Sequence, residues 1–113
     1  MLKIFRNPQA DFEKDAEAAA EVYTENVLQR MADSGFNAVW VRVIYHELLK
    51  NSKYPVFGKK SDQCLRALNR VIERGAKCGI ELAVYCQEPF GLAIDDPFWQ
   101  THPEMAGADY RLN

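Results

Sequence analysis

A run of β-branched and aromatic residues lies near the middle of the chain, and it restricts the folds that this sequence can adopt. The run covers residues 36–45, is almost continuously apolar, and ends where polar groups gather. That pattern is typical of a parallel strand that is buried on both faces. A second run of the same kind covers residues 80–86, and a short edge strand is expected over residues 2–5. The sequence therefore predicts an α/β fold with parallel strands.

Helical patterns alternate with these strands. Residues 11–33 are rich in alanine, and Tyr23, Val27 and Met31 recur at a spacing of four, which predicts an apolar stripe on a helix. Thr24 also fits an N-cap, where its hydroxyl would accept a backbone hydrogen bond. One continuous helix and two helices with a break near Tyr23 fit this segment equally well.

A second helical pattern covers residues 61–78, after a long connection over residues 46–60. Ser61 and Asp62 are expected to cap this helix, and Gly79 to end it in the left-handed conformation, as a glycine at position 35 ends the segment before the first strand. The apolar residues expected to form its buried stripe are Leu65, Leu68, Ile72 and Ala76. Strand, crossover helix and strand together predict a parallel βαβ unit with a preceding helix.

Composition and charge exclude several classes of function. The net charge of -2 and the pI near 5.7 argue against nucleic acid as a partner, since a basic surface drives that binding. No apolar run approaches the roughly 20 residues of a membrane span, so no membrane partner is expected. The N-terminus lacks the apolar core of a signal peptide, which favours a cytoplasmic location. The three cysteines show no paired spacing and are expected to be buried free thiols.

The ends of the two strands carry the candidate site. Ligands bind at the carboxyl ends of strands in parallel α/β folds. The sequence places Tyr45 and His46 after the first strand, and Gln87 and Glu88 after the second. Neighbouring strands lie roughly 4.8 Å apart, so these side chains can converge. We expect them to bind substrate together with Arg42, and Glu88 is the one residue of this chain considered for catalysis.

Side chains of the first strand alternate between two faces. Val39, Val41 and Val43 are expected to pack on helices, which turns Trp40 and Arg42 toward the inside of a sheet or barrel. A buried arginine needs a carboxylate partner, so Arg42 either binds a substrate group or closes a structural ion pair. The sequence leaves both roles open.

Aromatic residues gather in the loops that follow the strands. Such rings stack well on the C–H faces of sugars, and they also fasten a chain end to a core. The residues concerned are Tyr54, Phe57, Phe90, Phe98 and Trp99. The arginines of the second helix, Arg66, Arg70 and Arg74, are expected to form a solvated surface. The two histidines and the cysteines show no metal-ligand spacing, and no glycine-rich phosphate loop follows a strand, so we expect no metal and no cofactor.

The order of these motifs resembles that of a known enzyme family over residues 22–107. The segment Gly35-Phe36-Asn37-Ala38-Val39-Trp40-Val41 resembles the G-x-N-x-V-W entry of glycoside hydrolase (β/α) barrels, and His102-Pro103-Glu104 resembles the HPE segment that often follows. The likeness is to uncharacterised bacterial proteins similar to glycoside hydrolase family 20, the β-N-acetylhexosaminidase group. It implies a partial (β/α)8 TIM barrel that binds a carbohydrate substrate.

Two departures from the family limit what the resemblance implies. The adjacent Asp-Glu catalytic pair at the end of a later family strand is not reached here, and Trp40-Val41-Arg42 stands where typical members have His-x-His. A full barrel also needs roughly 250 residues. We therefore expect residues 1–113 to be a single domain, the N-terminal part of a larger catalytic barrel, and to be inactive alone.

Three functional hypotheses follow. The first is a part of a glycoside hydrolase-like barrel, which lines the cleft where two carboxylates hydrolyse a glycosidic bond. The second is a non-catalytic carbohydrate-binding or protein-interaction domain on a degenerate barrel scaffold. The third, a small flavodoxin-like domain, is disfavoured because no phosphate loop follows the first strand. If the barrel is truncated, its unpaired sheet edges would favour self-association.

Overall fold

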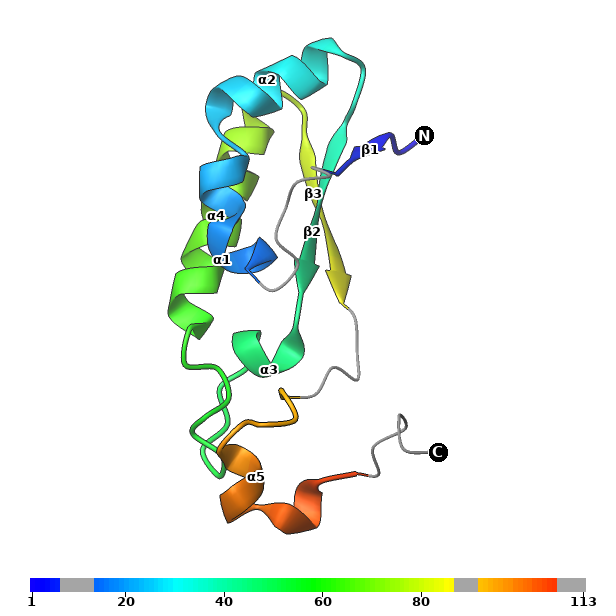
Figure 1. Ribbon diagram of the computed structural model, residues 1–113. Helices are drawn as coiled ribbons and strands as arrows, with labels where there is room; N and C mark the ends of the chain where they lie inside the picture. Colours follow the sequence, from blue (N-terminus) through cyan, green and yellow to red (C-terminus); the bar gives the residue numbers. More distant parts are fainter. Residues whose placement is uncertain (7–13, 87–91, 108–113) are drawn as a thin grey trace.

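Helices and strands alternate along the chain, as the sequence predicts. The computed structural model describes residues 1–6, 14–86 and 92–107 (Figure 1). Its elements are β1 (Ile4–Phe5), α1 (Asp15–Val22), α2 (Glu25–Asp33), β2 (Ala38–Val43), α3 (Tyr45–Leu48), α4 (Ser61–Ala76), β3 (Glu81–Cys86), α5 (Phe98–Thr101) and a 3-10 turn at Pro103–Met105.

The strands form one parallel sheet in the order β1-β2-β3. Ile4 lies opposite Ala38, and β2 then pairs with β3 along its whole length, up to Val43 opposite Cys86. Figure 1 shows α1, α2 and α4 on one side of this sheet, while no described helix lies against the other side. The predicted parallel βαβ unit and the edge strand before it are confirmed.

The core lies between the sheet and these three helices. Val39, Val41 and Val43 are fully buried there, which confirms that the aliphatic face of the strand packs on helices. The buried side chains that meet them come from α1, α2, α4 and the residues flanking them: Ala16, Ala19, Tyr23, Leu28, Cys64, Leu68, Val71 and Ile80. Trp40 and Arg42 accordingly lie on the helix-free face.

The first helical segment is broken into two helices at Tyr23. The Thr24 hydroxyl accepts a hydrogen bond from the Val27 N–H at 3.2 Å and caps α2. The guanidinium of Arg74 on α4 donates to the carbonyls of Ala20 and Tyr23, at 2.6 and 3.0 Å, which satisfies the end of α1. The two-helix alternative is therefore correct, and Arg74 has a structural role beyond a solvated surface.

β2 is shorter than the strand predicted over residues 36–45. It ends at Val43, and Tyr45–Leu48 form the short helix α3, in which the Glu47 and Leu48 N–H groups donate to the Ile44 carbonyl. Beyond Val43 the backbone makes local hydrogen bonds instead of ladder bonds.

The buried stripe of α4 also differs from the prediction. Of the four residues expected inside, only Leu68 is buried, whereas Leu65 and Ile72 are 43% and 49% exposed and Ala76 is exposed as well. The helix turns a face of smaller residues to the core, made of Ser61, Cys64, Ala67, Leu68, Val71 and Gly75. Small residues let α4 lie close to the chain that enters β3, and a side chain at position 75 would collide with the Ile80 carbonyl. Ser61 is a buried first residue of the helix and makes no capping bond.

Along part of the outer edge of β2, side chains form the hydrogen bonds that a neighbouring strand would otherwise form. β1 is only two residues long, so the outer edge of β2 extends beyond it. There the Tyr23 hydroxyl donates to the Trp40 carbonyl at 3.0 Å, and the buried Asp15 carboxylate accepts from the Arg42 N–H at 2.7 Å. Backbone groups at this edge thus obtain partners without a longer β1.

Candidate functional site

The carboxyl end of the sheet is where the chain places its loops and shorter helices. α3 follows β2 directly, and Figure 1 shows α5 beyond it, past the ends of β2 and β3. α3 carries Tyr45, which is exposed, and His46, which is half-buried. The Gly58 N–H donates to the His46 carbonyl at 2.7 Å, which holds the following loop against α3.

An aromatic cluster joins this loop to α5. Phe98 stands at its centre and is 7% exposed. Its ring centroid lies 4.5 Å from that of His102, 5.5 Å from that of Phe57 and 6.0 Å from that of Tyr54. Phe98 therefore fastens the end of the chain to the loop, which is one of the two roles expected of these aromatics. Trp99 packs edge-on against Phe98, with ring centroids 5.3 Å apart, and its indole N–H donates to the Ala93 carbonyl at 2.7 Å.

A pocket of about 450 Å³ opens beside this cluster. Its lining combines aromatic and aliphatic surface with an ammonium, a carboxylate, a hydroxyl and an imidazole. The lining residues are Tyr54, Pro55, Val56, Lys59, Asp96, Pro97, Phe98, Thr101 and His102. The Asp96 carboxylate accepts a hydrogen bond from the Phe98 N–H at 2.9 Å, which holds it at the beginning of α5.

This pocket can bind a small polar ligand that has an apolar face. The rings of Tyr54 and Phe98 offer stacking surface, and the polar side chains offer hydrogen bonds from several directions. Sequence reasoning singled out the aromatic residues but not Lys59 or Thr101. These two come from segments about 40 residues apart, and no local pattern marks them as neighbours.

The predicted site residues are distributed over two regions. His46 lies beside the aromatic cluster, with its ring 6.1 Å from that of Phe57. Arg42 is 7% exposed and belongs to the helix-free face of the sheet. Gln87 and Glu88 lie outside the described residues, as does Phe90 among the predicted aromatics.

The helix-free face around Arg42 is aromatic and basic. Trp40 stacks on Tyr85 with their ring centroids 5.1 Å apart and their planes at 26°. The Arg6 guanidinium lies 4.6 Å from the centre of the Trp40 ring. These contacts give the face a cation–π pair next to a stacked pair, on the side where the sequence predicted the inside of a barrel.

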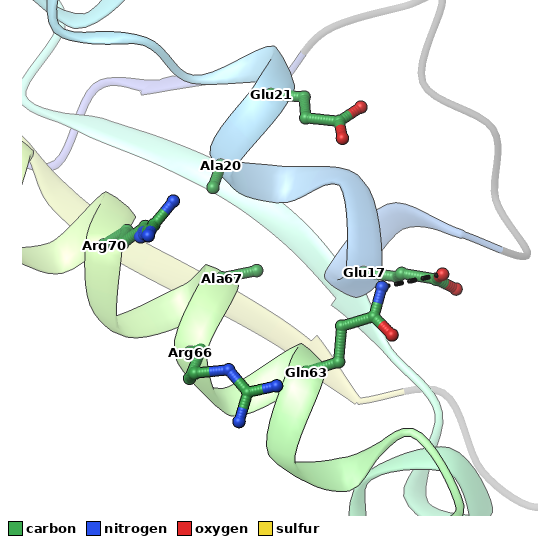
Figure 2. Close-up of a pocket in the computed structure, with 7 residues that line it drawn as sticks. All are labelled: Glu17, Ala20, Glu21, Gln63, Arg66, Ala67 and Arg70. Carbon is green, nitrogen blue, oxygen red and sulfur yellow. Dashed lines mark hydrogen bonds between the residues drawn. The ribbon is translucent and has the colours of Figure 1, made fainter.

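A second, smaller pocket lies between α1 and α4 on the helical side of the molecule (Figure 2). Its volume is about 220 Å³, and its lining mixes acidic and basic residues: Glu17, Ala20, Glu21, Gln63, Arg66, Ala67 and Arg70. Lys60 and Gln63 donate to the two Glu17 carboxylate oxygens, at 2.8 and 3.0 Å. These bonds tie α1 to the first turn of α4.

The Glu17–Lys60 pair gives the protein a defined response to acid. The hydrogen bond from Lys60 holds the pKa of Glu17 below its usual value. A lowered folded-state pKa means that the pair stabilises the fold above the ordinary glutamate pKa of about 4.3, and that this contribution is lost as the pH falls through the lowered pKa. We expect Lys60→Met to raise the pKa of Glu17 in an NMR titration of its carboxyl carbon.

The control for this titration is Lys50→Met. Lys50 binds Asp62 at 2.9 Å and holds the pKa of that carboxyl down in the same way. Its removal should raise the pKa of Asp62 and leave that of Glu17 unchanged. A Glu17 pKa that did not respond to Lys60→Met would show that the contact is absent in solution.

Within residues 1–6, 14–86 and 92–107, no group of three or more His, Cys, Asp or Glu side chains could hold a metal ion. The same ranges contain no helix that is both long and apolar enough to cross a bilayer. Burial raises the pKa of the Cys64 thiol, which keeps it protonated and unreactive, while Cys86 is exposed.

Comparison with protein-family models, with curated proteins and with solved structures found no match to this chain.

Proposed function

We propose that this chain is the carbohydrate-binding part of a glycoside hydrolase-like (β/α) barrel, and that the pocket between residues 54–59 and 96–102 holds a sugar ring. The observation that carries the proposal is the composition of that pocket, in which two aromatic rings adjoin four polar side chains at the carboxyl end of a parallel sheet. The sequence resemblance to glycoside hydrolase barrels supports the same function.

The size and position of the pocket suit such a ligand. Its volume of about 450 Å³ lies within the roughly 300–1,000 Å³ of typical small-molecule sites. In parallel α/β folds the loops after the strands form the binding site, and this pocket is built from those loops. The parallel strands, with the described helices on one face, are compatible with the early part of a barrel.

Hydrolysis would require more than this pocket supplies. Glycosidases use two carboxyl groups that lie about 5–10 Å apart. Asp96 is the one carboxylate among the lining residues, and one of its oxygens already accepts the Phe98 N–H. Under this proposal the pocket binds the sugar, while catalysis needs Glu88 or carboxylates from a larger barrel.

A sugar titration tests the proposal. We expect N-acetylglucosamine, glucose or galactose to shift the NMR signals of Thr101 and His102 in a saturable manner. Lys59→Met, which removes an exposed ammonium from the lining, should weaken the affinity about tenfold or more, since hydrogen bonds to charged groups contribute roughly 1.5–3 kcal/mol.

Lys53→Met is the matched control. Lys53 is an exposed lysine of the same loop, and it lies over the Tyr54 ring at 5.2 Å without lining the pocket. It should leave the affinity unchanged. No saturable shift with any of the three sugars, or equal losses in the two variants, would contradict the proposal.

Turnover separates this function from the non-catalytic alternative. A chromogenic aryl N-acetyl-β-glucosaminide should be cleaved only if catalytic carboxylates are present, and Glu88→Gln should then lower kcat. Sugar binding without turnover, unchanged by Glu88→Gln, would identify a carbohydrate-binding domain instead.

A further inference from the structure

The pocket proposed to hold a sugar ring is lined by charges of both signs, and the two signs come from different segments. Residues 53–60 carry three lysines and no acidic residue, whereas residues 95–104 carry three acidic residues and no lysine or arginine. Lys59 from the first segment and Asp96 from the second both line the pocket. Within the described part of the chain no ion pair joins these two, so the pocket keeps an ammonium and a carboxylate apart.

The carboxylates at the acidic side of the pocket already have partners. One oxygen of the half-buried Asp96 carboxylate accepts the Phe98 N–H at 2.9 Å. The Glu104 carboxylate, next to the lining, lies 3.4 Å from Nδ1 of the His102 imidazole. The second Asp96 oxygen can still accept a hydrogen bond from a ligand hydroxyl. Neither carboxylate requires a cationic ligand.

Lys59 differs in this respect from the lysines that flank it. Lys50 pairs with Asp62 at 2.9 Å, and Lys60 pairs with Glu17 at 2.8 Å. The Lys59 side chain is exposed to the pocket, and the described residues supply it with neither a hydrogen-bond acceptor nor an ion-pair partner. The unmatched charge in the lining is therefore the positive charge of Lys59.

We propose that the sugar held by this pocket carries an anionic group, a carboxylate or a phosphate, which the Lys59 ammonium binds. The inference rests on the proposed function, since it names the class of sugar that the pocket takes. The rings of Tyr54 and Phe98 face the C–H surface of the sugar, and the second Asp96 oxygen accepts from a ring hydroxyl. A hexose with an anionic group at its C6 end combines these features, because its ring is flat and hydroxylated and its charge lies at one end.

The expected gain in affinity is limited by two features of the lining. Lys59 is exposed, and an ion pair between exposed groups changes an equilibrium constant by about fivefold at most. Enclosure between two loops strengthens such a pair, because the local dielectric constant is lower than that of water. The Asp96 carboxylate opposes this gain, since it repels an anion that enters the same pocket.

Matched hexoses test the proposal. Glucose, glucuronic acid and glucose 6-phosphate share one ring and differ in the group at C6, and the NMR signals of Thr101 and His102 report their binding. We expect both anionic sugars to bind about fivefold more tightly than glucose at neutral pH and low ionic strength. The preference should disappear in about 1 M NaCl, where the Debye length is about 3 Å, while the affinity for glucose should change little.

Three variants assign the preference to particular charges. Lys59→Met should abolish it, so that the three sugars bind equally. Lys53→Met removes an exposed lysine of the same loop that does not line the pocket, and it should keep the preference. Asp96→Asn retains a side-chain oxygen for the Phe98 N–H and removes the repelling charge, so it should increase the preference.

The possible outcomes separate this inference from the proposed function. If glucose bound as tightly as both anionic sugars, or if the preference survived Lys59→Met, this inference would be wrong and the sugar site would stand. Absence of saturable binding by all three sugars would contradict the proposed function and this inference with it. A gain for one anionic sugar alone would support the inference and identify the anion as carboxylate or phosphate.

Inorganic phosphate distinguishes an anionic sugar from a free anion. It should bind far more weakly than glucose 6-phosphate, because it lacks the ring that stacks on Tyr54 and Phe98. Equal affinities for the two would show that the sugar ring contributes nothing, which would overturn the inference.

Discussion

Replacing Gly58 with alanine is expected to lower the free energy of unfolding by about 2–5 kcal/mol. Gly58 has φ +70°, a left-handed conformation that costs other residues about 1–2 kcal/mol. An added Cβ would also lie 2.6 Å from the Leu49 carbonyl oxygen and 2.7 Å from the Lys50 Cα, and overpacking of this kind costs about 1–3 kcal/mol more. Urea denaturation measures the change.

Gly79→Ala is the matched control for this experiment. Gly79 has nearly the same φ, +75°, but no atom lies within 4 Å of the Cβ that it would gain. It should cost only the conformational part, about 1–2 kcal/mol. Equal losses of unfolding free energy in the two variants would mean that the loop carrying Gly58 moves away from residues 49 and 50 without cost. Gly58 would then not hold this loop against α3.

Replacing Asp15 with alanine is expected to cost about 2–3 kcal/mol. The Asp15 carboxylate is buried and accepts the Arg42 N–H at 2.7 Å, in place of a strand that β1 is too short to provide. Its removal would leave a buried donor without an acceptor, which is more costly than the loss of an average hydrogen bond. Thermal and urea unfolding of the variant give the difference.

Tyr23→Phe provides the comparison at the same edge. It removes a neutral hydroxyl that donates to the Trp40 carbonyl at 3.0 Å and leaves the buried ring in place. The cost should be about 1 kcal/mol, smaller than that of Asp15→Ala. If Asp15→Ala proved the milder of the two, the carboxylate would not be the group that completes this edge.

The alternation of apolar residues predicted the strands well, because burial on two faces leaves a strong local pattern. Val39, Val41 and Val43 show it, since each is fully buried where the pattern places it. The same reasoning chose the wrong face of α4. The buried face carries smaller residues than the flank with Leu65 and Ile72, and Gly75 lies so close to the chain entering β3 that an added Cβ would collide with the Ile80 carbonyl. Apolar periodicity does not record such a close approach.

The candidate pocket was predictable only in part. Its aromatic residues stood out because apolar rings in loops are unusual, and Phe98 indeed organises the cluster. The polar lining was not predictable, since Lys59 and Thr101 meet through the folding of two separate loops. The strand end at Val43 was missed because Ile44 and Tyr45 continue the apolar pattern, although Tyr45 already begins α3.

The contact of Arg74 with the end of α1 has a consequence for the order of folding. A helix of eight residues does not persist alone in water, and α1 has its last carbonyls satisfied by a side chain more than 50 positions later in the chain. The helix thus gains its terminal hydrogen bonds only when that long loop closes. We therefore expect α1 to become stable only together with its docking onto α4.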